Sequence, residues 1–270
     1  MNTPTNPATI ISLQSREEIS LCDASLRHRF ELRRNKPMAI IIDAQQGLEL
    51  LAEQSEIGLS LQKELKLWHK ALGRRKISCI ELHYSGAFLH PFDITGIIHG
   101  IASKFDISDA LYRVVLSPDD AQTEVLALLR GLSFQHCQLA IEHAQSDQLQ
   151  MLEEPIDEAR TYKFARVGVQ IQHSEGVENL RKSIRVMRDR YSPDYIYIGS
   201  TTYPLGEKDI EQQTTLFKED LIEVSTDHLN LGPGASSKFG SLRLTNFSDI
   251  GHYLEEIEKG QLPLHQRPLS

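Results

Sequence analysis

Six short runs of β-branched and apolar residues, each followed by a helical stretch, constrain the fold of this chain most. The runs lie near Ala39–Ile42, Ile77–Leu82, Tyr112–Leu116, Gln138–Ile141, Arg166–Ile171 and Tyr195–Ile198. A strand–helix repeat of this kind is typical of parallel strands joined by right-handed crossovers. The sequence therefore predicts an α/β fold built from six strand–helix units.

Alternation within the strands divides their side chains between two faces. In the run Ile77–Leu82, Ile80 and Leu82 lie on one face, while Glu81 and the following His83 lie on the other. Because the helices carry single apolar stripes and must cover the apolar face, the polar set should line the concave side of a curved sheet. We therefore predict an open, partial (β/α)6 TIM-like barrel with a polar cavity. The residues expected to line this cavity and bind a ligand or cofactor are Asp43, Glu81, His83, Gln170, Gln172 and Tyr197.

The two ends of the chain fall outside this repeat. Residues 1–35 are polar and turn-rich, so we expect a loosely packed lead-in there and a single domain over residues 36–270. Near the C-terminus, the pattern predicts a helix over 207–219, a strand near Ile222–Leu229, a glycine-rich loop and a helix over 247–259. An open barrel leaves its final strand with unpaired backbone groups, and this late strand can pair there. We therefore expect a C-terminal strand–loop–helix cover of the barrel edge.

Charge and hydropathy exclude several classes of function. The net charge is −8, and no basic run is long enough to neutralise a series of phosphates. The longest apolar runs, such as Met38–Ile42, fall far short of the roughly 20 residues that span a bilayer, and no secretory leader is recognisable. We expect a cytoplasmic protein that binds neither nucleic acid nor membrane.

A glycine-rich segment near the C-terminus carries a family resemblance. Its pieces, in order, are Leu231 to Ser237, which reads LGPGASS, then Leu244-Thr245-Asn246, then Asp249 followed by His252-Tyr253-Leu254. This series resembles the "GLGPSAxS … xxN … DxxxYL" region of oxygen-independent coproporphyrinogen III oxidase-like proteins, which belong to the radical SAM superfamily. The resemblance covers about residues 38–265 and implies the same partial barrel.

The motifs that carry this family's chemistry do not match. The resemblance implies CxxxCxxC after the first strand, whose thiolates hold a [4Fe–4S] cluster that binds SAM. That place reads Asp43-Ala44-Gln45-Gln46-Gly47-Leu48, and no cysteine lies between Cys22 and Cys79. The motifs after the next three strands have become Tyr84-Ser85-Gly86-Ala87, Val115-Leu116-Ser117-Pro118 and Ile141-Glu142-His143. We therefore expect neither a [4Fe–4S] cluster nor SAM, and no radical SAM activity.

Histidines and a carboxylate also gather at the predicted carboxyl ends of the strands, where parallel α/β folds place their sites. Two or three imidazoles with one carboxylate suit zinc or iron, and an imidazole can ligate haem. The candidate metal ligands are His83, Glu142, His143 and His173. The alternatives are a polar rim that faces water and a site for acid–base catalysis.

Three functional hypotheses follow. The leading one is a degenerate, non-catalytic relative that uses the barrel cavity to bind a small molecule such as a porphyrin or a nucleotide. The second is a metal-dependent enzyme that uses the histidine–glutamate rim. The third is an interaction protein with a protein partner and an idle cavity. Likeness at the level of the fold does not choose among them.

Overall fold

A single curved sheet organises the molecule. The computed structural model describes residues 24–43, 54–87, 89–143, 145–173, 177–198 and 227–265, and within these the sheet has the strand order β10-β9-β8-β7-β1-β2-β3-β4-β5-β6. Six neighbouring strands make up one end of this sheet: β1 (Met38–Asp43), β2 (Ile77–Tyr84), β3 (Leu111–Leu116), β4 (His136–His143), β5 (Arg166–His173) and β6 (Tyr195–Ile198). Each of these strands runs parallel to its neighbours, so all six predicted strands are confirmed.

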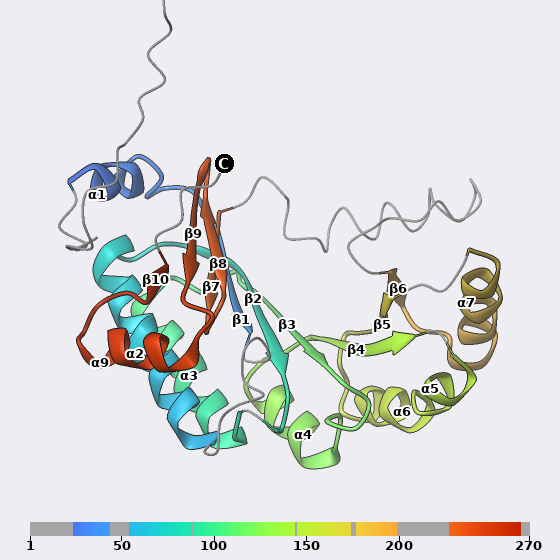
Figure 1. Ribbon diagram of the computed structural model, residues 1–270. Helices are drawn as coiled ribbons and strands as arrows, with labels where there is room; N and C mark the ends of the chain where they lie inside the picture. Colours follow the sequence, from blue (N-terminus) through green and yellow to red (C-terminus); the bar gives the residue numbers. More distant parts are fainter. Residues whose placement is uncertain are drawn as a thin grey trace, which may run out of the picture.

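The helices between these strands lie along the outer side of the sheet and follow its arc (Figure 1). They are α2 (Gln54–Leu72), α3 (Pro91–Lys104), α4 (Thr123–Gly131), α5 (Ser146–Gln150), α6 (Glu153–Thr161) and α7 (Val177–Tyr191). The sheet ends at β6 on one side and at β10 on the other, so it does not close on itself. The predicted open, partial (β/α)6 barrel is therefore confirmed. No helix in the described part of the chain is long and apolar enough to cross a membrane.

The apolar face of each strand packs under the helices, as alternation predicts. Ile80, Leu82 and Val169 are at most 1% exposed and belong to one core with Leu65 and Trp68 of α2. Each large apolar side chain buried in this way contributes about 1.5–3 kcal/mol to stability. The outer face therefore supplies most of the hydrophobic stabilisation, whereas the concave face carries polar side chains such as Glu81 and Gln138 together with smaller or apolar ones such as Ala39 and Val115.

The C-terminal segment covers an edge of the sheet, although not the expected one. It comprises β7 (Asp227–Leu231), β8 (Ser236–Phe239), β9 (Leu242–Asn246), α9 (Ile250–Glu258) and β10 (Leu264–His265). β7 pairs in parallel with β1, whereas the sequence led us to expect pairing with the final strand of the barrel. An open sheet has two edges, and the apolar residues Leu229 and Leu231 extend the core beside α2 rather than beside α7. The helix predicted over 207–219 lies outside the described residues.

The described part of the predicted lead-in contributes one aromatic side chain to the core. Helix α1 (Ala24–Glu31) carries Phe30, which is 4% exposed. The ring centroid of Phe30 lies 6.5 Å from that of Trp68 and 5.1 Å from that of Phe239. Phe30 therefore ties helix α1 to the core, while neighbouring side chains such as Leu32, which is 71% exposed, face solvent. The rest of that segment, residues 1–23, lies outside the described residues.

Candidate functional site

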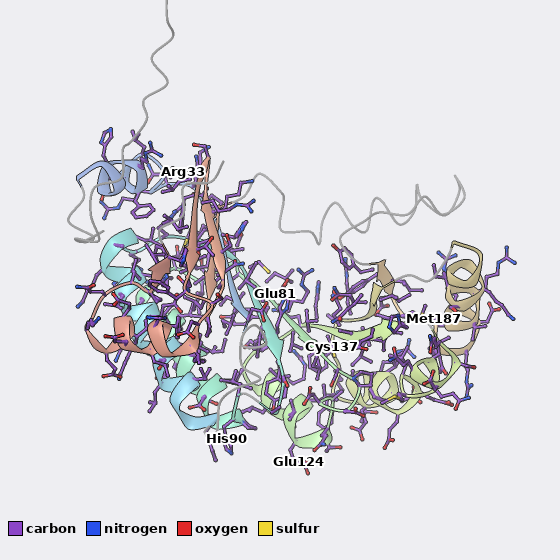
Figure 2. All side chains as sticks on the ribbon, viewed as in Figure 1. Arg33, Glu81, His90, Glu124, Cys137 and Met187 are labelled. Atoms are coloured by element: carbon purple, nitrogen blue, oxygen red, sulfur yellow. The ribbon has the colours of Figure 1, made fainter. Side chains whose placement is uncertain are left out.

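A charged cluster lies on the concave side of the sheet, on β2 and β3. Glu81 points into the arc (Figure 2) and is 7% exposed. Its Oε1 atom lies 2.6 Å from Nε2 of His83, and its Oε2 atom accepts a hydrogen bond of 2.6 Å from Nε of Arg113. The parallel register places Arg113 directly opposite Glu81. Both oxygens of this buried carboxylate are therefore engaged.

The cluster is held together by opposite charges. Burial raises the pKa of Glu81, but the hydrogen bond from His83 and the charges of Arg113 and His83 outweigh it and lower this pKa to about 2. Burial lowers the pKa of His83, but the hydrogen bond to Glu81 and the negative charges of Glu81 and Asp43 raise it overall. Glu81 is therefore an anion at neutral pH. It accepts a hydrogen bond from the Nε2–H group of His83.

Asp43 completes the cluster at the carboxyl end of β1. It stands opposite His83 in the register of β1 and β2, with Oδ2 3.9 Å from Nδ1 of His83. This distance is too long for a hydrogen bond. The side chains of Asp43 and His83 are 18% and 27% exposed, so these two residues form the solvent-facing end of the cluster. The structure thus brings together three of the predicted site residues, Asp43, Glu81 and His83.

A second, uncharged group occupies the concave side at β4 to β6. Nε2 of Gln138 donates a hydrogen bond of 2.7 Å to Oε1 of Gln170, and the hydroxyl of Tyr195 donates one of 3.3 Å to Oε1 of Gln138. Gly168 makes room for this arrangement, because a Cβ atom there would collide with the ring of Tyr195. Tyr197 stands opposite Gln170 in the register and is partly buried, while Gln172 is exposed.

Two residues of the concave face, Arg113 and Gln138, were not among the site residues predicted from the sequence. Arg113 alternates with the buried Tyr112 and Val114 in β3, and Gln138 alternates with the buried Cys137 and Leu139 in β4. The period-two pattern that singled out Glu81 would have found both residues. Their contacts with Glu81 and Gln170 follow from the strand order, which no local pattern contains.

The candidate metal ligands do not share a face. His83 and Glu142 occupy positions on the concave side of β2 and β4, whereas His143 and His173 occupy the opposite parity and stand across from each other in the register of β4 and β5. Adjacent strand residues such as Glu142 and His143 point to opposite sides. Within the described residues, no group of three histidine, cysteine or acidic side chains could hold a metal ion. Among the described side chains, Glu142 and His143 therefore do not converge on one ion.

The thiols do not fit an iron–sulfur cluster either. Cys79 and Cys137 are the cysteines within the described residues, and alternation places Cys79 on the concave side and Cys137 in the core. Burial raises the pKa of Cys137 to about 12, so this thiol stays protonated. Cluster ligands are thiolates, of which three or four must converge. These two residues supply no such set, and the stretch after β1 contains no cysteine in the sequence.

The three pieces of the family-like C-terminal motif converge on one buried carboxyl group, that of Glu64 in α2. Its Oε2 atom accepts hydrogen bonds from the backbone N–H of Gly232 at 3.0 Å and from the hydroxyl of Tyr253 at 2.8 Å. Its Oε1 atom accepts from Nδ2 of Asn246 at 2.8 Å and from Nε1 of Trp68 at 3.1 Å. These contacts fasten the cover to α2, so the motif has a structural role.

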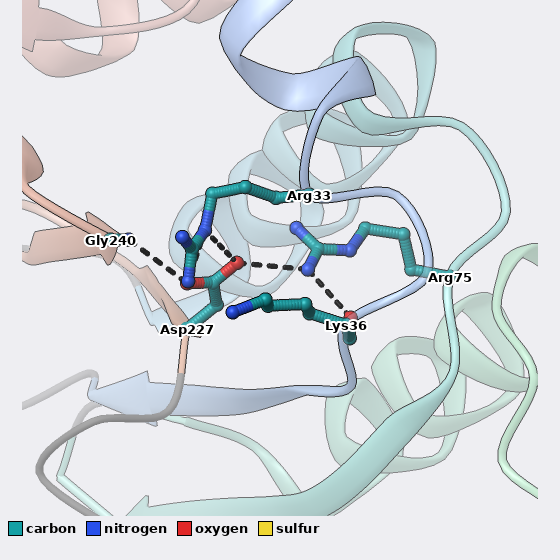
Figure 3. A network of polar contacts seen from close by, with 5 residues as sticks. All are labelled: Arg33, Lys36, Arg75, Asp227 and Gly240. Carbon is teal, nitrogen blue, oxygen red and sulfur yellow. Dashed lines mark hydrogen bonds and ion pairs between the residues drawn. The ribbon is translucent and has the colours of Figure 1, made fainter.

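A second buried carboxylate fastens the start of the cover (Figure 3). Asp227 accepts hydrogen bonds from Nη2 of Arg33 at 2.6 Å, Nη2 of Arg75 at 2.9 Å and the backbone N–H of Gly240 at 2.9 Å. Arg75 also donates to the carbonyl oxygen of Lys36 at 2.7 Å. Burial raises the pKa of Asp227, but the hydrogen bonds and charges of the two arginines lower it overall. This network joins the chain before β1, the start of β2 and the cover.

No family model and no curated protein matches this chain, but solved structures do. Coproporphyrinogen III oxidase (HemN) from Escherichia coli, described as a radical SAM enzyme, matches with a TM-score of 0.68 and 12% sequence identity, over 89% of this chain and 73% of its own. HydG, described as a maturase of the FeFe-hydrogenase, matches with a TM-score of 0.45 and 12% identity, over 90% of this chain and 65% of its own. The likeness to HydG is too loose to support an argument.

The fold is therefore a partial (β/α)6 barrel similar to that of this coproporphyrinogen III oxidase, as the C-terminal motif predicted. At 12% identity the likeness concerns the fold alone, and the function has to be argued from the site.

Proposed function

We propose that this chain is a binding protein with a radical SAM fold, which holds a small molecule on its concave side and carries out no iron–sulfur radical chemistry. The charged cluster of Glu81, His83 and Arg113 carries this proposal. It reaches solvent through Asp43 and His83 at the carboxyl ends of β1 and β2. Parallel α/β folds bind their ligands at this end of their strands.

The energetics of the cluster favour a functional reason for its presence. Taking charged groups out of water is costly, and well-packed apolar side chains in place of a buried ion pair are often neutral or stabilising. The helix-facing side supplies the hydrophobic core, and Glu81 and Arg113 lie outside it. Buried ionisable groups with displaced pKa values, set on the ligand-binding side of a fold, are typical of functional sites.

Two features support the absence of radical SAM chemistry. The first is the lack of a thiolate set, which an iron–sulfur cluster requires. The second concerns the turn after β2, which in the resembling family reads GGGTP and contacts the SAM amino group. In this chain the same place reads Tyr84-Ser85-Gly86-Ala87.

Anaerobic reconstitution tests this part of the proposal. The purified chain is treated with iron and sulfide, then supplied with SAM and a reductant, beside an active radical SAM enzyme as positive control. We expect no stoichiometric iron–sulfur absorption and no 5′-deoxyadenosine from the chain. A stoichiometric cluster together with SAM cleavage would contradict the proposal.

A ligand screen tests the binding function. Small polar molecules are screened by saturation-transfer NMR against the wild type, Asp43→Asn and the exposed control Asp119→Asn. We expect hits that bind the wild type and the control but are weakened by Asp43→Asn. Hits that bind all three proteins equally would place the binding away from the concave side.

A further inference from the structure

We infer that His83 donates a hydrogen bond through Nδ1 to the bound molecule, and that this molecule is uncharged and presents an amide or lactam group. The inference rests on the proposed binding function and specifies the ligand chemistry of the same site. It depends on the orientation of one imidazole ring and on the charges that surround it.

Glu81 and Arg113 fix the orientation of the His83 ring. Arg113 binds Oε2 of Glu81, and Oε1 of Glu81 binds Nε2 of His83 at 2.6 Å. With Nε2 fixed to the buried carboxylate, Nδ1 is the remaining polar atom of the ring, and the side chain is 27% exposed. A histidine whose one nitrogen is held by a carboxylate presents the other nitrogen in a defined direction. Arg113 and Glu81 therefore act as positioning residues for Nδ1.

The charges around His83 favour a protonated ring. From β1 it faces Asp43, from its own strand Glu81, and from β3 Arg113. The two carboxylates outweigh the single guanidinium and burial, so the pKa of His83 is raised. In the protonated ring, which these two carboxylates favour, Nδ1 carries a proton and is a hydrogen-bond donor beside the carboxylate acceptor of Asp43.

A donor beside an acceptor selects the class of ligand. The distance of 3.9 Å between Nδ1 of His83 and Oδ2 of Asp43 allows one small group to meet both atoms. An amide or lactam does so, because its carbonyl oxygen accepts from Nδ1 and its N–H donates to Asp43. A carboxylate or phosphate would face the carboxylate of Asp43, and an ammonium group would face the positively charged imidazole. Both charged classes are therefore disfavoured.

Two matched pairs of probes test this chemistry. Nicotinamide and nicotinate differ in having an amide or a carboxylate, and uracil and 1,3-dimethyluracil differ in having or lacking N–H groups. We expect nicotinamide and uracil to bind, and their partners to bind about tenfold more weakly, in NMR titrations. The affinity for nicotinamide should fall as the pH rises through the raised pKa of His83, because Nδ1 then loses its proton.

Variants locate the effect. His83→Gln should weaken nicotinamide binding about tenfold and abolish its pH dependence, while the exposed control His99→Gln should change neither. Thermal unfolding of both variants checks that they fold. Equal or tighter binding of nicotinate, unchanged affinity in His83→Gln, or failure of both nicotinamide and uracil to bind would overturn the inference. Preferential binding of nicotinate would leave the proposed binding function standing, whereas SAM cleavage by the reconstituted chain would overturn that function.

Discussion

Buried carboxylates in this chain ionise according to the partners that surround them. Burial raises the pKa of both Glu81 and Asp227, but hydrogen bonds and charges from cationic partners reverse the effect. These partners are His83 and Arg113 at Glu81, and Arg33 and Arg75 at Asp227. Glu64 accepts four hydrogen bonds from uncharged donors and faces no cation, and burial raises its pKa to about 7. The comparison shows that a nearby positive charge, rather than the number of hydrogen bonds, decides the ionisation of these groups.

Glu64 should make the free energy of unfolding depend on pH. Because its pKa is raised from 4.5 to about 7, the folded protein binds the extra proton between these values. Protonated Glu64 therefore stabilises the folded protein by about 3 kcal/mol below pH 4.5, and this stabilisation is lost as the pH rises through 7. Glu64→Gln should remove this dependence. It should also cost about 1–3 kcal/mol at low pH, because its NH2 group meets other donors.

Urea unfolding at about pH 5 and about pH 7.5 measures both effects. The control is Glu124→Gln, which changes an exposed carboxylate on α4 (Figure 2). The control should keep the pH dependence of the wild type. The same pH dependence in Glu64→Gln would show that this carboxyl group does not titrate in the folded protein.

The Asp227 network should respond unequally to the loss of its members. Asp227→Asn leaves the guanidinium of Arg75, whose side chain has no exposed area, without its counter-ion, and should cost about 3–5 kcal/mol. Arg33→Gln should cost less, because Arg33 is 23% exposed and Arg75 still neutralises Asp227. Urea unfolding of the two variants gives the comparison. Equal, small losses would mean that the network contributes little to stability.

At the scale of elements, local patterns predicted the strands and helices well because each depends on residues close in sequence. In β5, the alternation of Val167, Val169 and Ile171 with polar residues fixed both the strand and its buried face. The pairing of β7 with β1 was beyond such patterns, because its apolar residues suit either edge of an open sheet. Likewise, the contact of Arg33 with Asp227 joins residues 194 positions apart, which no spacing motif reveals.

Helix α1 should behave as part of the core. Phe30→Ala removes a buried ring that packs between Trp68 and Phe239, and should cost about 3–5 kcal/mol. Leu32→Ala, two residues away and 71% exposed, is the matched control and should stay within about 0.5 kcal/mol of the wild type. Thermal or urea unfolding measures both variants. A Phe30→Ala protein as stable as the control would show that the segment is loosely packed, as its composition indicates.

The described parts of the molecule should unfold as one unit, because barrel and cover share their buried polar groups. Glu64 lies in the barrel helix α2 and takes hydrogen bonds from the cover, while Asp227 lies in the cover and binds Arg75 at the start of β2. Separating the two parts would break these hydrogen bonds and leave the groups that stay buried without partners, which is costly. Cooperativity between barrel and cover therefore follows from polar contacts as well as from the common core.

The single tryptophan offers a direct test of this cooperativity. Trp68 is fully buried where α2 meets the cover, so its fluorescence reports on their separation, whereas far-UV circular dichroism reports on the whole chain. In urea, the two signals should change at the same midpoint. Deletion of residues 227–270 should abolish the cooperative transition, because it exposes the edge of β1 and removes three of the four donors to Glu64. A fluorescence change at lower urea than the dichroism change, or a cooperative transition in the deletion variant, would show that the cover is a separable appendage.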